Sequence, residues 1–278
     1  MGYKSRRHAL GQHFLADRPL ALKIVETALT EATAKGCKSI LEIGPGSGAL
    51  TNILLETLPS SIGIEELILC ERDKKYAERW TSKEVAVKNF KIHNADFMEL
   101  EDNAWISRPP VAVVSNLPYS AGTAIVTKLA RYPAEIPVMV LMFQTEVARR
   151  LRAEKGTKDW GSLSIWIQNK WLVQKLFSVS PKSFKPPPKV DSEVVILTPR
   201  KQPLISAGDY PDSEVWLEKM LKAFFQQRRK MLRASVGRDP TWRNTLELAE
   251  VDGTKRAEVL GWDEWTKLLQ ALLSLKHK

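Results

Sequence analysis

Short apolar runs alternate with helical patterns along the first half of the chain. The runs predict five buried strands, at residues 39–43, 67–71, 90–94, 111–115 and 137–142. Stretches with helical character lie between some of them, at residues 49–58, 73–81 and 121–131. Such alternation is typical of β-α-β units and therefore predicts a doubly wound, parallel sheet.

In the second half the pattern changes. Two apolar runs, 163–169 and 193–198, predict consecutive strands without a helix between them, and therefore an antiparallel end to the sheet. The prolines and the glycine of residues 198–212 predict a linker, and the chain beyond it has only helical spacing. We therefore expect an α/β domain over residues 1–205 and a small all-α domain over residues 206–278.

Composition and charge exclude several classes of protein. The 278 residues are 44% hydrophobic and 27% charged, as in a globular protein of about two domains. No apolar run approaches a membrane span, and no apolar segment follows the basic N-terminus as in a signal peptide. Two cysteines and four histidines show neither a disulfide framework nor metal-ligand spacing. The expectation is a cytoplasmic protein without a metal, and the net charge of +10 favours a polyanionic partner, either nucleic acid or an acidic membrane surface.

The glycine-rich segment Gly44–Gly48 joins the first predicted strand to a helix. Glycines there let a ligand reach backbone N–H groups, so the segment predicts a nucleotide-type cofactor site rather than a plain turn. Its spacing fits a dinucleotide as well as S-adenosylmethionine, and Glu71 at the next strand end suits the ribose of either. Two other acids favour S-adenosylmethionine. Glu42 offers negative charge to a sulfonium, and Asp96, beside the stacking face of Phe97, offers an acceptor to the adenine amine.

The tetrad Asn116-Leu117-Pro118-Tyr119 follows the fourth predicted strand, at the edge of the sheet where the cofactor is expected. The exocyclic amine of adenine is a poor nucleophile because its lone pair is delocalised into the ring. The amide oxygen of Asn116 and a backbone carbonyl near Pro118 can accept the two amine hydrogens and direct the lone pair at a methyl sulfonium. Tyr119 can stack on the base. The alternative is an ordinary turn at a strand end.

These features together resemble the ribosomal RNA adenine N6,N6-dimethyltransferases of the KsgA type. The matching segments are Gly11–Leu15, Glu42–Gly48, Glu71, Asp96, Asn116–Tyr119, Phe184–Ser192, Phe225–Leu232 and Lys255–Leu260. The resemblance covers nearly the whole chain. It implies a Rossmann-like class I methyltransferase with a mostly parallel seven-stranded sheet and a helical, RNA-binding C-terminal domain.

The resemblance also implies an activity. The enzyme would use S-adenosyl-L-methionine to dimethylate two adjacent adenines in a hairpin near the 3′ end of small-subunit (16S) ribosomal RNA. This would occur in the cytoplasm during ribosome biogenesis, with the small ribosomal subunit and its rRNA as partners, no membrane or metal, and a monomeric protein. The implied cofactor-binding residues are Gln12, His13, Leu15, Gly44, Gly46, Glu71, Asp96, Phe97 and Asn116. The implied catalytic residues are Asn116, Leu117, Pro118 and Tyr119. His13 stands where the family usually has asparagine, which makes a pH dependence conceivable.

Two further regions are candidates for binding RNA. Phe184 lies in a loop stiffened by prolines, where an exposed ring would stack on a flipped adenine opposite Tyr119, or would otherwise pack as local core. Residues 220–238 contain six cations and no acid, among them Arg228, Arg229 and Lys230, and a second, more diluted basic group spans residues 149–158. We expect phosphate contacts from the first group.

Three other functions stay open. The first is a large-subunit rRNA adenine methyltransferase of the macrolide-resistance type, although the sequence of residues 184–192 and the helical C-terminal segment favour the small-subunit type. The second is a non-catalytic ribosome-assembly factor that binds RNA, against which the intact tetrad argues. The third is a nicotinamide-dependent dehydrogenase, which only the glycine spacing supports.

Overall fold

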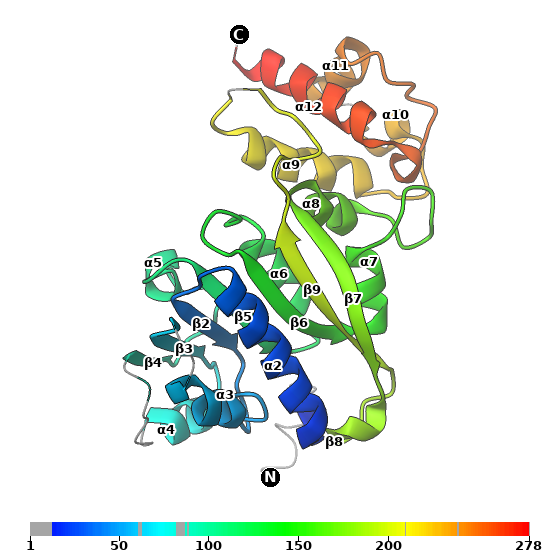
Figure 1. Cartoon of the computed structure of the whole chain (residues 1–278). Coiled ribbons are helices and arrows are strands. Elements are labelled where there is room, and N and C mark those ends of the chain that lie inside the picture. Colours follow the sequence, from blue (N-terminus) through cyan, green and yellow to red (C-terminus); the bar gives the residue numbers. More distant parts are fainter. Residues whose placement is uncertain are drawn as a thin grey trace. The chain divides into compact units, whose positions relative to one another are not determined.

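The computed structural model describes residues 13–60, 63–81, 87, 89–208, 210–237 and 239–277 (Figure 1). The chain divides into two compact units, of which the first combines residues up to 148 with residues 172–199. The second combines residues 149–171 with residues from 200 onward. Residues 149–171 are thus grouped with the C-terminal helices, whereas the sequence led us to expect a single boundary at residue 205. None of the described helices combines the length and apolar character that crossing a bilayer would need.

The first unit is built on a seven-stranded sheet with the strand order β4-β3-β2-β5-β6-β9-β7. Five neighbouring strands run parallel: β2 (Ser39–Ile43), β3 (Glu66–Cys70), β4 (Asn89–His93), β5 (Val111–Asn116) and β6 (Val138–Gln144). Strand β9 (Ser192–Pro199) pairs antiparallel with β6, and β7 (Trp171–Val179) forms the edge beyond it. The predicted mostly parallel sheet with an antiparallel end is confirmed.

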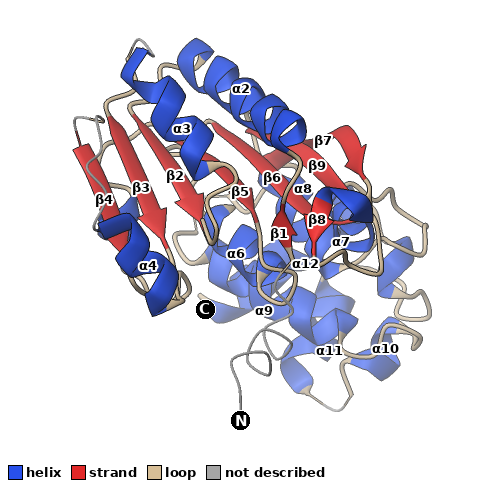
Figure 2. Cartoon of the chain, turned by 90° about the horizontal axis from the view of Figure 1, so that it is seen from below, coloured by secondary structure: helices blue, strands red, loops and turns tan. Residues whose placement is uncertain are grey.

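Helices cover both faces of this sheet, which explains why its central strands are buried and mostly apolar. Helices α2 (Arg18–Ala34) and α3 (Thr51–Thr57) lie on one face, and α6 (Gly122–Leu129) lies on the other (Figure 2). Every residue of β2 and β3 is buried. Helix α2 begins where Asp17 accepts a hydrogen bond from the amide of Leu20. The shorter elements of this unit include η1 (Leu58–Ser60), α4 (Lys74–Thr81), α5 (Asp102–Trp105), α7 (Thr145–Leu151) and η2 (Pro181–Ser183).

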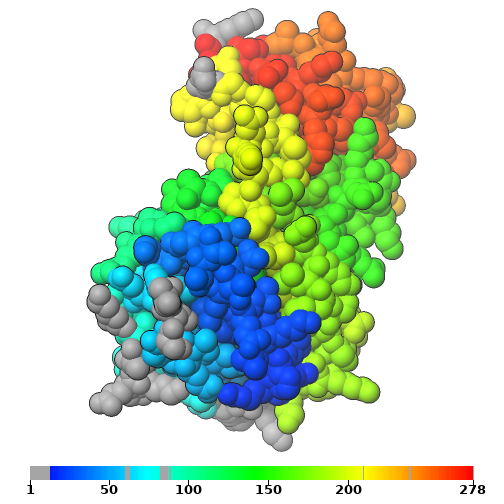
Figure 3. Space-filling view, viewed as in Figure 1, coloured from blue at the N-terminus to red at the C-terminus, as the bar shows by residue number. Residues whose placement is uncertain are grey.

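A two-stranded sheet joins the first described residues to the proline-rich loop. Strand β1 (Phe14–Leu15) pairs antiparallel with β8 (Phe184–Lys185), and the amide of Ala16 donates to the carbonyl of Ser183 at 2.8 Å. In the space-filling view, the blue surface of the N-terminal residues accordingly lies beside the lime-green surface near β7 and β8 (Figure 3). Two sequence motifs more than 160 residues apart are thus brought together.

The strand predicted at residues 163–169 is wrong. These residues belong to helix α8 (Ser162–Lys170), and the strand begins only at Trp171. Five consecutive residues of α8, Leu163–Ile167, are buried, so its apolar run carries no periodicity that would distinguish a helix from a buried strand. Ser164 stabilises the helix start, because its hydroxyl accepts from the Gly161 amide and donates to the carbonyl of Arg150.

The second unit is helical, as predicted for the C-terminal region. Besides α8 it contains α9 (Ser213–Phe225), α10 (Leu232–Ser235), α11 (Pro240–Leu248), η3 (Ala257–Val259) and α12 (Trp262–Lys276). The apolar stripes of α9 and α12 pack together. Trp265 of α12 is fully buried, with its ring stacked on Phe225 at 5.7 Å and edge-on to Phe224 at 6.1 Å.

Candidate active site

A cavity of about 260 Å³ opens at the carboxyl ends of the parallel strands in the first unit. The glycine turn after β2 and the segments that follow β3, β4 and β5 meet there. Twelve of the residues singled out from the sequence line it: His13, Leu15, Glu42, Gly44, Gly46, Glu71, Asp96, Phe97, Asn116, Leu117, Pro118 and Tyr119. Gln12 lies outside the described residues. Phe184, Arg228, Arg229 and Lys230 are not part of the lining.

The three glycines of the turn stand at positions where a side chain would be strained or would clash. Gly44, Gly46 and Gly48 have φ angles of 69°, 51° and 91°, a backbone region that favours glycine. A Cβ atom on Gly48 would lie 2.4 Å from Trp80, and one on Gly46 would lie 3.0 Å from the Phe14 ring. The turn therefore forms a cradle of backbone before α3, in which the amides of Gly44, Gly46 and Gly48 already donate to Cys70, Glu71 and Pro45.

Glu71 stands at the centre of the cavity wall, directly after β3. Its two carboxylate oxygens accept hydrogen bonds from the amides of Gly46, at 2.9 Å, and Asp73, at 2.8 Å. Burial raises the pKa of Glu71, and these backbone hydrogen bonds oppose the rise. Each oxygen keeps a further lone pair, so the carboxylate can still accept from vicinal hydroxyls such as those of a ribose.

Glu42 lines the deep end of the cavity and is only 2% exposed. Its carboxyl accepts a hydrogen bond from the Thr51 hydroxyl at 2.8 Å. Burial raises the pKa of Glu42 to about 8. The bond from Thr51 opposes this rise, and the nearby Glu71 adds to it. Glu42 is therefore largely protonated at neutral pH and can lose its proton to a cationic ligand, whereas neither acid offers positive charge to an anionic ligand such as a pyrophosphate.

The segment after β4 supplies the opposite wall. The Asp96 carboxylate accepts from the amide of Met98 at 3.0 Å and pairs with the Arg72 guanidinium at 3.3 Å. Phe97 is 3% exposed, and its ring contacts Trp105 with the centroids 5.3 Å apart. An acidic acceptor and a planar apolar side chain therefore lie next to each other at the cavity wall, which suits a purine.

The tetrad turns sharply away from β5. The Ser115 hydroxyl donates to the carbonyl of Ile43 and joins the end of β5 to the start of the glycine turn. The Pro118 carbonyl is already used, because it accepts from the amides of Ala121, at 3.0 Å, and Gly122, at 2.8 Å, where α6 begins. Within the described part of the chain, no donor is paired with the carbonyl of Leu117. The acceptors that remain at this turn are therefore the Asn116 amide oxygen and the Leu117 carbonyl.

Tyr119 is held on two sides. Its hydroxyl lies 2.9 Å from that of Ser192, at the end of the proline-rich loop. Its ring lies 5.5 Å from the His13 ring, at an interplanar angle of 35°. His13 in turn donates from Nδ1 to the carbonyl of Pro186 at 2.8 Å. Sequence reasoning missed Ser192 as a separate site residue, and its only signal was its place at the end of a motif.

The expectation of an exposed Phe184 ring is wrong. Phe184 is 2% exposed and belongs to the hydrophobic core. The reason is the pairing of β8 with β1, which sets Phe184 opposite the buried Leu15. Phe184 therefore packs as local core, which was the alternative expectation. Of the two rings expected to stack on the adenine, only that of Tyr119 is accessible.

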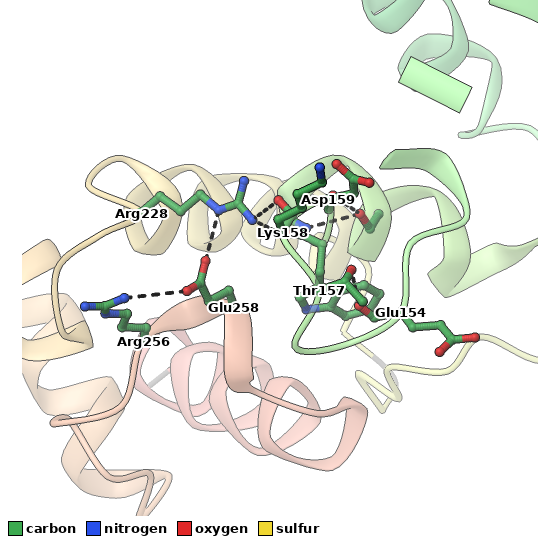
Figure 4. A network of polar contacts seen from close by, with 10 residues as sticks. Glu154, Thr157, Lys158, Asp159, Arg228, Arg256 and Glu258 are labelled. Atoms are coloured by element: carbon green, nitrogen blue, oxygen red, sulfur yellow. Dashed lines mark hydrogen bonds and ion pairs between the residues drawn. The ribbon is translucent and has the colours of Figure 1, made fainter. Parts of the chain in front are cut away.

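Arg228 is engaged within the helical unit (Figure 4). Its Nη2 donates to the carbonyls of Lys158 and Trp160, the latter at 2.9 Å, and its Nε donates to Glu258 at 3.1 Å. The guanidinium expected to contact phosphate thus binds the loop at residues 154–160. In contrast, Arg229 is exposed, and no partner is recorded for it among the described residues.

The sheet order, the antiparallel last strand and the cavity at the carboxyl edge define a class I methyltransferase fold. A sequence model of the ribosomal RNA adenine dimethylases matches residues 3–277, and the chain belongs to this family. It is 35% identical over 274 residues to the ribosomal RNA small subunit methyltransferase A of Saccharophagus degradans, covering 98% of this chain and 96% of that one.

Two solved structures share the fold. The 23S rRNA methyltransferase ErmE superposes with a TM-score of 0.61 at 27% identity, covering 93% of this chain and 99% of that one. A dimethyladenosine transferase from Plasmodium falciparum superposes with a TM-score of 0.68 at 24% identity, covering 95% and 98%. The predicted fold class and family are thereby confirmed.

Proposed function

We propose that this chain is an S-adenosylmethionine-dependent enzyme that dimethylates the N6 amines of two adjacent adenines in small-subunit ribosomal RNA. The target is a hairpin near the 3′ end of that RNA, and the reaction belongs to small-subunit biogenesis in the cytoplasm. One observation carries the proposal: the tetrad Asn116–Tyr119 lines the same cavity as the glycine turn and the buried acids Glu42 and Glu71. Groups that can accept the hydrogens of the adenine amine and acids that can bind a cation therefore line the same cavity.

The residues of the cavity fit S-adenosylmethionine. The glycine cradle admits an adenosine, Glu71 suits the ribose hydroxyls, and Asp96 beside Phe97 suits the adenine. When bound, the cofactor supplies an electrophilic methyl group on a sulfonium. Glu42 can ionise beside this cation, whereas the pyrophosphate of a nicotinamide dinucleotide would face two acidic side chains that offer it no positive charge. The electrostatics of the wall thus argue against the dehydrogenase alternative.

The chain's own groups orient the target amine. Asn116 Oδ1 and the carbonyl of Leu117 accept its two hydrogens, which turns the nitrogen lone pair toward the methyl donor. Tyr119 stacks on the adenine, and its hydroxyl bond to Ser192 fixes the plane of the ring. When the N–CH3 bond forms and the S–CH3 bond breaks, the methylated amine loses its proton to water, so no ionised side chain is required as a base.

The helical unit and its basic residues serve RNA binding in this proposal. Arg229 and Lys230 are exposed in the turn that follows α9, and Lys155 and Lys158 are exposed on the loop that Arg228 holds. Cations without buried counter-charges bind phosphates and release counterions. The partner is the small ribosomal subunit, bound by a monomer without a metal.

The test uses undermethylated small subunits and, in parallel, large subunits, each incubated with purified protein and methyl-labelled S-adenosylmethionine. The expected product, after digestion of the RNA, is N6,N6-dimethyladenosine from small subunits only. Labelled adenine from large subunits instead would establish the macrolide-resistance type of activity. This activity is the second candidate because the chain shares its fold with the 23S rRNA methyltransferase ErmE. Label in neither subunit would overturn both. Asn116→Ala serves as the inactive control, because it removes an amine acceptor while leaving the glycine cradle intact.

A further inference from the structure

Lys128 reaches from α6 to the loop behind the cofactor cavity. Its ammonium donates to the carbonyl of Phe97 at 3.1 Å and to the carbonyl of Leu100 at 2.6 Å. A carboxylate oxygen of Asp102 lies 3.7 Å away, and the side chain of Lys128 is only 15% exposed. One partly buried cation therefore binds several acceptors of a single short segment.

This segment needs such a partner. Residues 97–100 form a tight turn after Asp96, and their carbonyl oxygens have no strand to pair with. A buried carbonyl without a donor costs about 1–3 kcal/mol, and the three N–H groups of an ammonium can serve more than one carbonyl at once. The ammonium also lies 5.2 Å from the centroid of the Phe97 ring, within the range of a cation–π contact.

The other side of the same segment is the wall of the cavity. Asp96 and Phe97 both line it, although Phe97 exposes only 3% of its surface. Behind Phe97 stands the fully buried Trp105, which Tyr132 contacts edge-on at 5.1 Å. Tyr132 donates its hydroxyl to Asp102, the residue that also faces Lys128. The rings support Phe97 from behind, and the lysine fixes the backbone of its turn.

We propose that Lys128 is a positioning residue for the adenine end of the cofactor. It does not line the cavity and acts through Phe97 and Asp96, by holding their backbone where the ring and the carboxylate meet a purine. This inference rests on the proposed function, since it takes S-adenosylmethionine as the ligand of the cavity. It predicts that Lys128 affects the binding of the adenine and not the binding of the methionine half of the ligand.

The test is the affinity for two ligands, S-adenosylhomocysteine and 5′-methylthioadenosine, measured by calorimetry well below the melting temperature. Lys128→Met keeps the length of the side chain and removes its donors. We expect the Kd of both ligands to rise at least tenfold and by the same factor, because both carry the adenine. The affinity for the small subunit should stay within twofold of wild type. If Lys128→Met is unfolded at the assay temperature, Lys128→Leu, which also lacks donors, is measured with the same expectation.

A matched control is Lys23→Met. Lys23 also places its ammonium over a ring, 4.4 Å from the centroid of Phe177, but it lies on α2 and does not line the cavity. Its variant should bind both ligands as wild type does. The inference is overturned if the Lys128 variant binds both ligands normally, if it loses only S-adenosylhomocysteine, or if its affinity for the small subunit falls equally. Failure of the wild type to bind either ligand would instead overturn the proposed function.

Discussion

The hydroxyl of Tyr119 lies 2.9 Å from the hydroxyl of Ser192, although 73 residues separate them in the chain. One belongs to the tetrad after β5 and the other to the end of the proline-rich loop where β9 begins. The pairing of β6 with β9, in which Gln144 stands opposite Ser192, sets the position of this serine. The antiparallel end of the sheet therefore has a part in the site, because it fixes the ring proposed to stack on the target adenine.

Replacing Ser192 by alanine should weaken this arrangement without abolishing the reaction. A hydrogen bond of this kind contributes about 1 kcal/mol, so we expect the KM for the RNA to rise about fivefold. The affinity for S-adenosylhomocysteine should stay unchanged, because Ser192 does not line the cavity. Steady-state kinetics with undermethylated small subunits and calorimetry with S-adenosylhomocysteine measure the two effects. Equal losses in both measurements would show that Ser192 supports the whole fold rather than Tyr119.

The raised pKa of Glu42 predicts how stability changes with pH. The carboxyl stays protonated in the folded chain up to a pKa of about 8, whereas its ordinary value is 4.5. Its contribution to stability is therefore complete below pH 4.5 and is lost as the pH rises to 8. Relative to Glu42→Gln, the free energy of unfolding of the wild type should fall by up to about 5 kcal/mol over this range. Denaturant titrations at pH 5, 7 and 8.5 measure the difference, which would be constant if Glu42 titrated normally.

The same carboxyl should make the choice between S-adenosylmethionine and S-adenosylhomocysteine depend on pH. Only the first carries a sulfonium charge, and only ionised Glu42 attracts that charge. The ratio of the two affinities should therefore rise several-fold in favour of S-adenosylmethionine between pH 6.5 and 8.5. In Glu42→Gln the ratio should stay flat, since the charge of Glu42 is absent. A ratio that rises equally in both proteins would assign the effect to another group, of which Glu71 is the nearest candidate because burial raises its pKa too.

Much of the fold and of the cavity could be predicted because the signals are local. The strands from β2 to β6 are apolar runs bounded by turns, and parallel strands bring their carboxyl ends to one edge. That rule alone places Glu71 near the tetrad, and the structure shows both in the cavity lining.

The features that could not be predicted depend on partners far away in the chain. Phe184 is buried because β8 pairs with β1 across more than 160 residues. Nothing in the sequence distinguishes Lys128 from the other lysines, because its contacts depend on the packing of α6 against the turn that begins at Phe97. Helix α8 is buried over the five consecutive residues Leu163–Ile167, which removes the periodicity that would have identified it.

Arg228 and Arg229 are neighbours in the sequence and should behave differently. Arg228→Ala removes the donors that hold the carbonyls of Lys158 and Trp160, so the loop at residues 154–160 should open more often. The amide of Gly156, which donates to the backbone carbonyl of Glu258 at 3.2 Å, should then exchange its hydrogen at least tenfold faster.

Arg229→Ala should leave this exchange unchanged. It should instead weaken RNA binding and reduce the slope of log affinity against log salt by about 1, as expected for one lost phosphate contact. Hydrogen-exchange mass spectrometry and salt titrations of binding to the small subunit measure both variants. If the two variants show the same salt slope and the same exchange rates, Arg228 contacts phosphate as Arg229 does and does not hold the loop.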